Sequence, residues 1–505
     1  MSVATTHTAQ GMITGGIPVT IEADLVRGLH SFSIVGLPGK AIEEAKDRVS
    51  AAIKNSGFAS PKSQNHKITI SLAPADIKKE GPLFDLGIAL AYLAAANSIT
   101  IDTVKRMYVG ELSLSGELRP VRGVLRAVQT AKENSFTEII VPTENIAEAA
   151  LIEGIAVLGA KTLRDVIEHV TANNERPSPL KIAPLTIIEP NWIEGLVRLE
   201  DIKGQAQAKR GLIIAAAGRH NVIMAGPPGT GKTMLARAFQ GILPPLSREE
   251  ALEVTAIHSL AGEFKGKVTT QPPFRAPHHT ASHTALVGGG TNPKPGEVTL
   301  AHRGVLFADE FPEFDRRSID ALRQPLEDRV VSISRISGTA LFPADFILIA
   351  AMNPYRGTED GSTDYATAMM ETYKGKISGP ILDRIDLWLP VPHVDYETLT
   401  SAKIETNETS DARDQVQAAR ERMLARLGER GVRTNAEMSA RDIEATIILN
   451  DEVKDLLRLS SAKLNLSPRS FHRVIKVART IADLDQSEQV ETKHILEALQ
   501  YRVQV

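Results

Sequence analysis

The sequence predicts an α/β protein of three parts: an N-terminal mixed α/β domain, a central domain built on a parallel sheet, and a C-terminal helical lid domain. Length is the first reason, because 505 residues correspond to about three domains at roughly 150 residues each. A polar, proline-containing seam at residues 173–190 is the second. The third is a change after about Pro392, where strand signals fade and amphipathic helical patterns dominate.

The composition is that of an ordinary globular protein. Hydrophobic residues at 42% and charged residues at 24% exclude a disordered, collagen-like or coiled-coil chain. The net charge of −3 means that any contact with nucleic acid has to be local. The chain has no cysteine, which excludes disulfides, thiol nucleophiles and cysteine metal sites. Its start has no secretory pattern and no apolar run is long enough to span a membrane, so we expect a cytoplasmic location.

The first part, residues 1–172, alternates strand-like and helix-like segments. Apolar and polar residues alternate over 68–72, which predicts a strand with one buried face. Apolar residues at helical spacing over 42–53 predict a helix that ends before Gly57. Residues 173–195 are predicted to form a linker.

The central part, residues 196–394, contains short apolar runs between longer helical stretches. The runs at 222–224, 305–307 and 346–349 are typical of strands in a parallel sheet that is buried on both faces. Residues 395–505 are predicted to be the helical domain. One helix of this domain is predicted to have a core face formed by Val474, Val477, Ala478 and Ile481. Its solvated face is predicted to carry His472, Arg473 and Lys476.

The most specific motif is a glycine-rich loop that matches G-x-x-x-x-G-K-[ST] and lies between an apolar strand and an amphipathic helix. Its residues are Gly226, Pro227, Pro228, Gly229, Thr230, Gly231, Lys232 and Thr233. Backbone N–H groups of such a loop and the following helix N-terminus favour phosphate, Lys232 reaches the outer phosphates and Thr233 can ligate Mg²⁺. The motif therefore predicts binding of a nucleotide such as ATP, together with Mg²⁺.

Hydrolysis of a bound nucleotide also needs an acidic metal ligand and a group that activates water, and an acidic pair can supply both. Residues 304–308 read as an apolar strand that ends in Asp309 and Glu310. Downstream of a phosphate loop, Asp309 is predicted to hold Mg²⁺ and Glu310 to polarise the attacking water.

Further segments carry a resemblance that covers nearly the whole chain. They are residues 35–38, 51–57, 72–76, 274–280, 304–314 and 378–387. Through them the chain resembles AAA+ ATPases of the magnesium-chelatase type, more narrowly the YifB/ComM subfamily. The resemblance implies a homohexameric ring that hydrolyses ATP, acts as a DNA helicase and promotes branch migration of recombining DNA.

The same resemblance implies roles for three more residues. Asn353 resembles the sensor that hydrogen-bonds the γ-phosphate or the attacking water. Arg384 resembles the arginine finger that a neighbouring subunit inserts, which requires a ring. Arg469 resembles the second sensor of the lid, at a helix start predicted from Ser467 and Pro468. The residues alone leave open that Asn353 is a turn residue and Arg384 a surface charge.

The first part resembles the Lon-protease catalytic fold through residues 79–82 and 110–117. Proteolysis of that kind needs a serine nucleophile and a lysine base. By alignment of these motifs, the nucleophile position holds Leu83 and the lysine position falls near Leu125, and neither side chain can do the chemistry. We therefore expect a non-proteolytic platform for DNA or subunit contacts.

Residues 255–302 are rich in glycine and are predicted to form a long functional loop, with an ordinary surface loop as the alternative. Four cations in it can track a DNA backbone in a ring channel: Lys265, Lys267, Arg275 and Lys294. Four histidines lack a carboxylate or thiolate at ligand spacing, so we expect them to order the loop rather than bind metal: His278, His279, His283 and His302.

The predicted partner is branched or single-stranded DNA, bound without sequence specificity, because 4% aromatic residues allow few base-stacking platforms. Two other functions stay open: a chelatase-type ATPase that remodels a protein partner, and an ATP-dependent protease.

Overall fold

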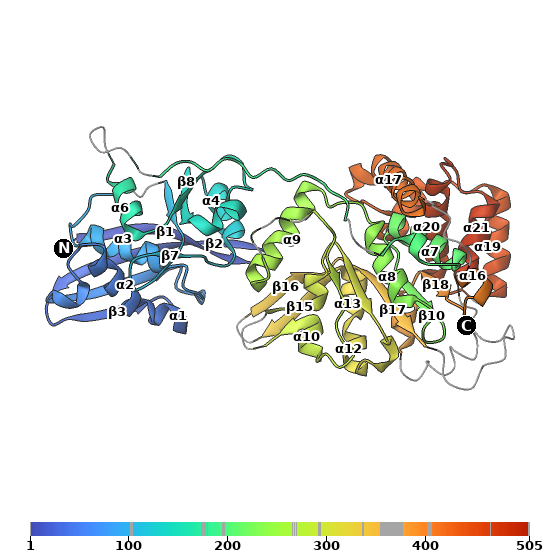
Figure 1. Cartoon of the computed structure of the whole chain (residues 1–505), viewed down its shortest axis with the longest axis horizontal. Helices are drawn as coiled ribbons and strands as arrows, with labels where there is room; N and C mark the ends of the chain where they lie inside the picture. The colour runs from blue at the N-terminus through green and yellow to red at the C-terminus, as the bar shows by residue number, and fades with distance from the viewer. Residues whose placement is uncertain are drawn as a thin grey trace. The chain divides into compact units, whose positions relative to one another are not determined.

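The structure is a computed structural model that describes residues 2–101, 105–172, 178, 180–193, 197–264, 266, 268, 270–290, 294–335, 338–353, 377–400, 407–464 and 466–502. The chain divides into two compact units (Figure 1). The first comprises Met1–Glu189 and Arg248–Thr269, and the second comprises Pro190–Ser247 and Thr270–Val505. Each unit has its own hydrophobic core.

The first unit is a mixed α/β domain, as predicted. Its larger sheet has the order β1-β2-β4-β3, in which only β3 and β4 pair in parallel. The strands are β1 (Ser2–Met12), β2 (Gly15–Arg27), β3 (Ser31–Val35) and β4 (His66–Ala73). In β4 the side chains of Ile68, Ile70 and Leu72 are buried, which confirms the predicted alternation. The predicted helix forms as α1 (Lys40–Glu43) and α2 (Ala45–Asn55) and ends before Gly57, whose φ is +93°.

A parallel sheet of order β5-β8-β9 and several helices complete this unit. These elements are β5 (Arg106–Tyr108), β8 (Glu138–Pro142), β9 (Ala156–Ala160), α3 (Asp85–Ala95), α4 (Val124–Glu133) and α6 (Leu163–Val170). The segment 180–188 runs along the same unit, where Thr186 N–H donates to Ala150 O at 2.9 Å.

Helix α9 (Arg248–Ala261) belongs to the first unit, although it follows the phosphate loop in the chain. It packs against α4 and buries its apolar face, including Ile257. The Ser259 hydroxyl accepts a hydrogen bond from the Gly123 N–H at 2.9 Å, and Arg248 pairs with Glu153 at 2.6 Å. Residues 255–302 are therefore not one loop: the prediction was wrong for α9, and for α10 (His283–Val287) and α11 (Glu297–Leu300) farther along.

The second unit is built on a five-stranded sheet of order β11-β14-β17-β10-β18, in which every neighbouring pair is parallel. Its strands are β10 (Val222–Ala225), β11 (Phe274–Arg275), β14 (Val305–Ala308), β17 (Ile347–Met352) and β18 (Leu387–Pro390). The three apolar runs predicted from the sequence form β10, β14 and β17, except that Phe346 directly precedes β17, and their residues are buried on both faces. The predicted parallel sheet is confirmed.

Helices and one hairpin surround this sheet. They include α7 (Ala206–Gly218), α8 (Lys232–Gly241), α12 (Arg316–Ala321), α13 (Arg323–Asp328), β15 (Val330–Arg335) and β16 (Gly338–Pro343). No helix within the described ranges is long and apolar enough to cross a membrane.

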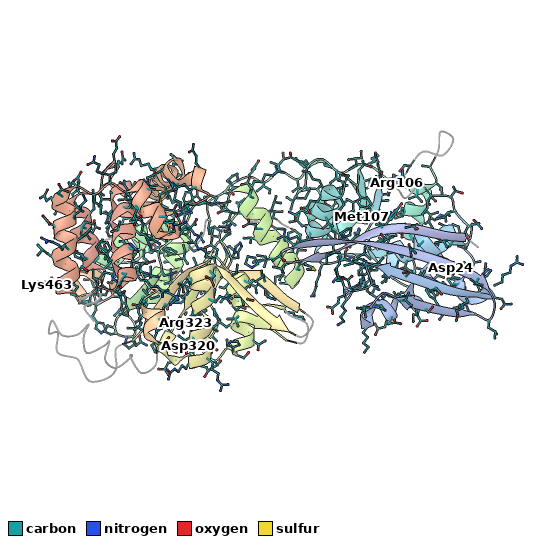
Figure 2. The ribbon with its side chains drawn as sticks, turned by 180° about the vertical axis from the view of Figure 1, so that it is seen from behind. Asp24, Arg106, Met107, Asp320, Arg323 and Lys463 are labelled. Atoms are coloured by element: carbon teal, nitrogen blue, oxygen red, sulfur yellow. The ribbon has the colours of Figure 1, made fainter. Side chains whose placement is uncertain are left out.

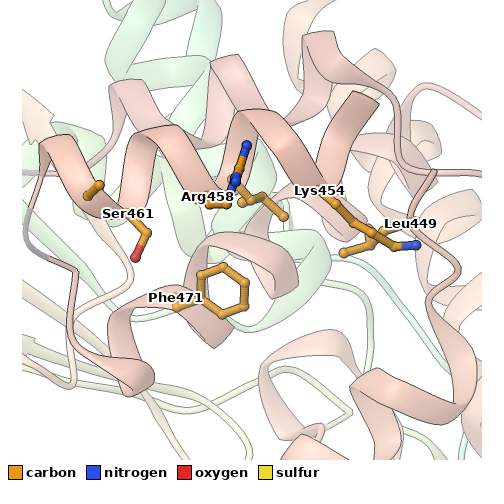
Figure 3. Close-up of a pocket in the computed structure, with 7 residues that line it drawn as sticks. Leu449, Lys454, Arg458, Ser461 and Phe471 are labelled. Carbon is orange, nitrogen blue, oxygen red and sulfur yellow. The ribbon is translucent and has the colours of Figure 1, made fainter. Parts of the chain in front are cut away.

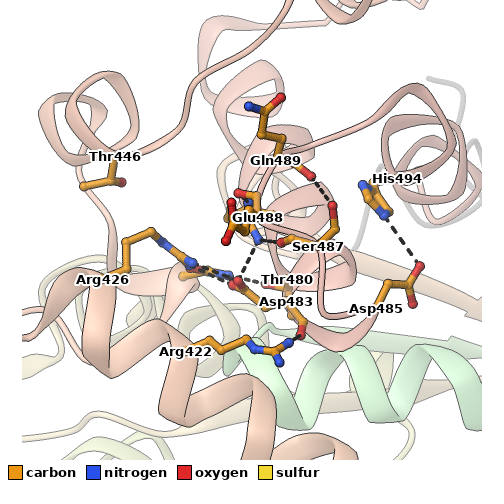
Figure 4. A network of polar contacts seen from close by, with 12 residues as sticks. Arg422, Arg426, Thr446, Thr480, Asp483, Asp485, Ser487, Glu488, Gln489 and His494 are labelled. Carbon is orange, nitrogen blue, oxygen red and sulfur yellow. Dashed lines mark hydrogen bonds and ion pairs between the residues drawn. The ribbon is translucent and has the colours of Figure 1, made fainter.

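After Pro392 the described residues contain helices and no strand, as predicted. The main helices are α17 (Glu408–Leu427), α18 (Ala440–Thr446), α19 (Asp451–Lys463), α20 (Pro468–Leu484) and α21 (Thr492–Gln500). Asp483 on α20 links these helices, since it accepts a hydrogen bond from Arg426 (Figure 4). It also accepts hydrogen bonds from Arg479 and Asn435. With an exposed fraction of 1%, the Asp483 carboxylate is a buried charge, and it is stabilised by these partners.

Helix α20 begins as the sequence predicts. Ser467 is the N-cap, accepting from the Ser470 N–H at 3.2 Å, and Pro468 is the first helical residue. The predicted core face is buried. The predicted solvated face is wrong for two residues, because other segments cover it: Arg473 pairs with Asp386 at 3.0 Å, and Lys476 Nζ donates to Ala436 O at 3.1 Å.

Candidate active site

Three loops leave the carboxyl edge of the parallel sheet side by side. In the strand register Ala225 at the end of β10 pairs with Met352, the end of β17, and Ala308 at the end of β14 pairs with Ala350. The phosphate loop, the acidic pair and Asn353 directly follow these three strands. Ligands of open α/β sheets bind at this edge. The sheet thus gathers residues that lie more than a hundred positions apart in the chain.

Glycines shape the phosphate loop where side chains have no room. A Cβ on Gly226 would lie 2.0 Å from the carbonyl oxygen of Val391. Gly229 and Gly231 have φ of +79° and +92°, in the left-handed region that favours glycine. Helix α8 begins at Lys232, so its free N–H groups point toward the loop.

Lys232 is folded against the loop itself. Its Nζ donates to the carbonyl oxygens of Gly226 at 2.8 Å and Pro227 at 2.7 Å. Burial lowers the pKa of Lys232, and the nearby Asp309 carboxylate opposes that shift. Thr230 closes the same turn, since its hydroxyl donates to Pro227 O at 2.9 Å. A phosphate would replace the two carbonyl contacts of Lys232 with stronger, charge-assisted ones.

The two predicted Mg²⁺ ligands touch each other. The Thr233 hydroxyl donates to Asp309 Oδ2 at 3.1 Å, joining the start of α8 to the end of β14. A hydroxyl and a carboxylate are oxygen donors of the kind Mg²⁺ prefers, with phosphate and water oxygens completing its octahedron. The donor set therefore fits Mg²⁺, which when bound would neutralise charge that develops on the phosphates.

Glu310 stands out by its backbone. Its φ of +51° is in the left-handed region, which costs a residue with a side chain about 1–3 kcal/mol and is enriched at functional sites. The carboxylate is half exposed, and its Oε2 lies 3.1 Å from Nδ1 of His279. The sequence places His279 in the segment 274–280 and among four histidines expected to order a loop, but it does not predict the contact with Glu310.

Asn353 follows β17 at the same edge and is half-buried. The segment 354–376 after it lies outside the described residues.

Arg384 and Arg469 are not at this edge. Arg384 precedes β18, whose first residue, Leu387, pairs with Val222, the first residue of β10, so Arg384 lies at the amino edge of the sheet. Both arginines donate to the carboxylate of Glu327. Arg384 is 5% exposed, whereas the Arg469 side chain is 61% exposed. The predicted site residues thus form two groups on opposite edges.

Comparison with known proteins identifies the family of this chain. The family "Magnesium chelatase, subunit ChlI" matches residues 198–399, "Subunit ChlI of Mg-chelatase" matches 21–145, and "Magnesium chelatase, subunit ChlI C-terminal" matches 406–502. The competence protein ComM of Haemophilus influenzae is 42% identical over 512 residues, which cover 100% of this chain and 98% of that protein. The chain belongs to the ComM/YifB family of magnesium-chelatase-like AAA+ proteins. Membership of this family supports ATPase activity and the use of nucleotide and Mg²⁺.

A second relative is similar to this chain over nearly its full length, and a more distant protein is similar to part of it. The uncharacterized protein YifB of Escherichia coli is 42% identical over 511 residues, covering 99% of this chain and 97% of that protein. Lon protease 2 of Bacillus subtilis is 28% identical over 153 residues, which are 29% of this chain and 27% of the protease. This ComM/YifB member therefore has a Lon-like N-terminal region, as predicted.

At the two positions that correspond to the Lon serine nucleophile and lysine base, this chain has apolar side chains in the core. Leu83 is 8% exposed and Leu125 is fully buried. Ser113 is also buried, and its hydroxyl is occupied by Ser115 at 2.8 Å and by the Glu117 N–H at 3.0 Å.

The proposed DNA-tracking cations have different surroundings. Arg275 forms a two-pronged ion pair with Glu297, at 2.6 and 2.8 Å, which neutralises its charge. Lys294 is exposed. Lys265 and Lys267 lie outside the described residues.

The four predicted loop histidines have different partners. The rings of His278 and His279 pack against each other at 4.2 Å, and His278 Nδ1 contacts the Thr280 hydroxyl at 2.8 Å. His302 Nδ1 accepts from the Asp345 N–H at 3.1 Å, and His283 begins α10. In the part of the chain that the structure describes, no group of three or more His, Cys, Asp or Glu side chains is placed to hold a metal ion.

A mostly apolar cavity of about 480 Å³ lies among the C-terminal helices and not at the sheet edge (Figure 3). Its lining includes Leu449, Leu457 and Phe471. The two cations beside it, Lys454 and Arg458, pair with acidic residues of their own helix. No phosphate-loop residue lines it.

Proposed function

We propose that this protein is an ATP-hydrolysing motor that works as a homohexameric ring, acts as a DNA helicase and promotes branch migration of recombining DNA. The observation that carries the ATPase part is the 3.1 Å contact between Thr233 and Asp309 beside the phosphate loop. It brings a predicted nucleotide motif and a predicted acidic motif to one point, where Mg²⁺ and the phosphates would bind.

The residues divide the chemical work among them. Lys232 and the loop N–H groups bind the phosphates, and Thr233 and Asp309 hold Mg²⁺. Glu310 orients the attacking water and accepts its proton, and Asn353 contacts the γ-phosphate or this water. Arg384 and Arg469 would approach the nucleotide from a neighbouring copy, since they lie at the other edge of the sheet.

The DNA part rests on the relationship to ComM along the full chain. A net charge of −3 fits backbone tracking by a few local cations better than coating of DNA, and Lys294 offers one such exposed cation.

ATP-dependent dissociation of a synthetic four-way DNA junction tests this proposal. The wild type should separate the junction, whereas Lys232→Ala should lose nucleotide binding and Glu310→Gln should bind ATP without hydrolysing it. Hydrolysis by the wild type without movement of a junction or forked substrate would overturn the DNA part only.

A second candidate is an ATPase that remodels a protein partner, as three magnesium-chelatase matches favour. ATPase stimulation by a protein and not by DNA would support it. Proteolysis is disfavoured by Leu83 and Leu125 in the core, and degradation of casein by purified wild type would restore it.

A further inference from the structure

Glu327 joins the two arginines for which the family resemblance implies roles. Its Oε1 accepts from Nη2 of Arg469 at 2.9 Å, and its Oε2 accepts from Nη2 of Arg384. The three residues come from α13, from the segment before β18 and from the start of α20. One carboxylate thus fixes two guanidinium groups that lie 57 and 142 positions away in the chain.

The surroundings of this carboxylate are strongly cationic. Burial lowers the pKa of Arg384, and the charges of Arg469, Arg323 and Arg473 lower it further. Arg323, labelled in Figure 2, lies one turn before Glu327 on α13. Four guanidinium groups repel one another here unless a negative charge separates them.

Glu327 supplies that charge to Arg384 and Arg469. Within the described ranges, no other carboxylate forms an ion pair with either arginine. The nearby Asp386 is committed elsewhere, to Arg473 at 3.0 Å and to the Asn221 N–H at 3.1 Å. Without Glu327, the almost fully buried Arg384 would be a charge with no counter-ion, which is destabilising and favours a different position of the guanidinium group.

The arginine pair is separated from the nucleotide site of its own chain. Arg384 lies at the amino edge of the sheet and Lys232 follows the carboxyl edge, with the four residues of β10 between them. At about 3.3 Å per residue, a strand of this length places the two edges roughly 10 Å apart. In the proposed ring, the pair would meet a nucleotide held at the carboxyl edge of a second copy, and that shared site would be incomplete without the second copy.

We propose that Glu327 is a positioning residue of this shared site: it holds the guanidinium groups of Arg384 and Arg469 together so that both act on the triphosphate bound by a second copy of the chain. Glu327 itself touches no substrate and moves no proton. It fixes the orientation of two planar, multi-donor cations, and phosphate recognition depends on that orientation. This inference rests on the proposed ATPase function.

Steady-state ATPase kinetics of Glu327→Gln provide the first test. The amide keeps the size of the side chain but removes the charge, so kcat should fall about tenfold to a hundredfold, as small misplacements of catalytic groups do. KM for ATP should stay within about threefold, because the phosphate loop is untouched. Glu444→Gln, an exposed carboxylate on α18, is the matched control and should leave both constants unchanged.

Mixing of variants provides a readout that a merely structural role would not move. Lys232→Ala has intact arginines and a defective nucleotide site, and Glu327→Gln has the opposite combination. Mixed rings should regain part of the ATPase activity that each variant lacks alone. Glu327→Asp, which restores the charge on a shorter stem, should recover part of kcat without mixing. If Glu327→Gln melts at a lower temperature than the wild type, both tests are run below its melting temperature, where it is folded.

The outcomes separate this inference from the function it rests on. If the wild type hydrolyses no ATP, the proposed function and this inference both fail. If the wild type is active and Glu327→Gln equals or exceeds it, only the positioning role fails, and a higher kcat would mean that the bridge restrains the arginines. Rings that assemble from the two variants and stay inactive would likewise overturn the role.

Discussion

His279 Nδ1 lies 3.1 Å from Oε2 of Glu310, so the residue expected to polarise the attacking water is in contact with a histidine of the segment after β11. The two residues follow neighbouring strands of the sheet, since β11 pairs with β14. The contact occupies one carboxylate oxygen of Glu310 and therefore restrains the orientation of this carboxylate.

Replacement of His279 by alanine should raise the ATPase rate measured without DNA. The loss of one hydrogen bond corresponds to about a 2- to 10-fold increase in kcat, because such a bond contributes about 0.5–1.5 kcal/mol net. His283→Ala is the matched control, since His283 is an exposed histidine at the start of α10, whereas the ring of His278 packs against that of His279 at 4.2 Å. A fall in kcat as deep as that of Glu310→Gln would show instead that His279 assists the reaction.

Thr233→Ala should mainly change the dependence on Mg²⁺. The substitution removes one of the two protein oxygens that meet at 3.1 Å, while Lys232 and the loop N–H groups stay in place. We expect the Mg²⁺ concentration for half-maximal ATPase to rise about tenfold or more, with rescue by Thr233→Ser. Titration of Mg²⁺ at saturating ATP measures this, and an unchanged titration would exclude Thr233 as a ligand.

The sequence predicted the structural features that depend on residues close together in the chain. The buried strands, the phosphate loop and the start of α20 at Ser467 depend on neighbours within a few residues, and all three are found where expected. The contact between Thr233 and Asp309 could also be expected from the sequence, because parallel strands end at a common edge of the sheet.

The sequence did not predict the contacts between segments that lie far apart in the chain. Helical periodicity shows which face of α20 is apolar, but not that Asp386 covers Arg473 on the other face. The sequence around Arg384 likewise does not predict that tertiary packing buries its guanidinium group against Glu327. The packing of α9 in the first unit was not predicted for the same reason, since the sequence of α9 does not indicate that it packs against α4.

Ile257→Ala tests whether α9 stabilises the first unit. Ile257 is 1% exposed, and truncation of a buried isoleucine costs about 2–5 kcal/mol. Hydrogen exchange in α3 and α4 of the first unit should accelerate accordingly, while exchange in the sheet of the second unit stays unchanged. Leu424→Ala, at a leucine that is 57% exposed on α17, is the control and should change neither. Faster exchange confined to the second unit would contradict the assignment of α9.

Lys476 gives a prediction about pH, because burial lowers its pKa to about 8 from the ordinary value of 10.5. The native state then binds fewer protons than the unfolded state between these two values, so the stability contributed at this position rises with pH across that window. At pH 7 the folded protein instead carries the cost of a buried ammonium. Lys476→Met should therefore raise the free energy of unfolding at pH 7 by about 1–2 kcal/mol, net of the lost hydrogen bond to Ala436.

The same variant should lose most of this advantage at pH 10, where the native lysine is already neutral. Urea unfolding of wild type and Lys476→Met at both pH values measures the difference, and Lys454→Met, at a side chain that is 61% exposed, serves as the control with little effect at either pH. If Lys476→Met were less stable than the wild type at pH 7, the hydrogen bond to Ala436 would outweigh the cost of burying the charge. An equal gain at pH 7 and pH 10 would mean that added apolar contact, and not proton binding, stabilises the variant.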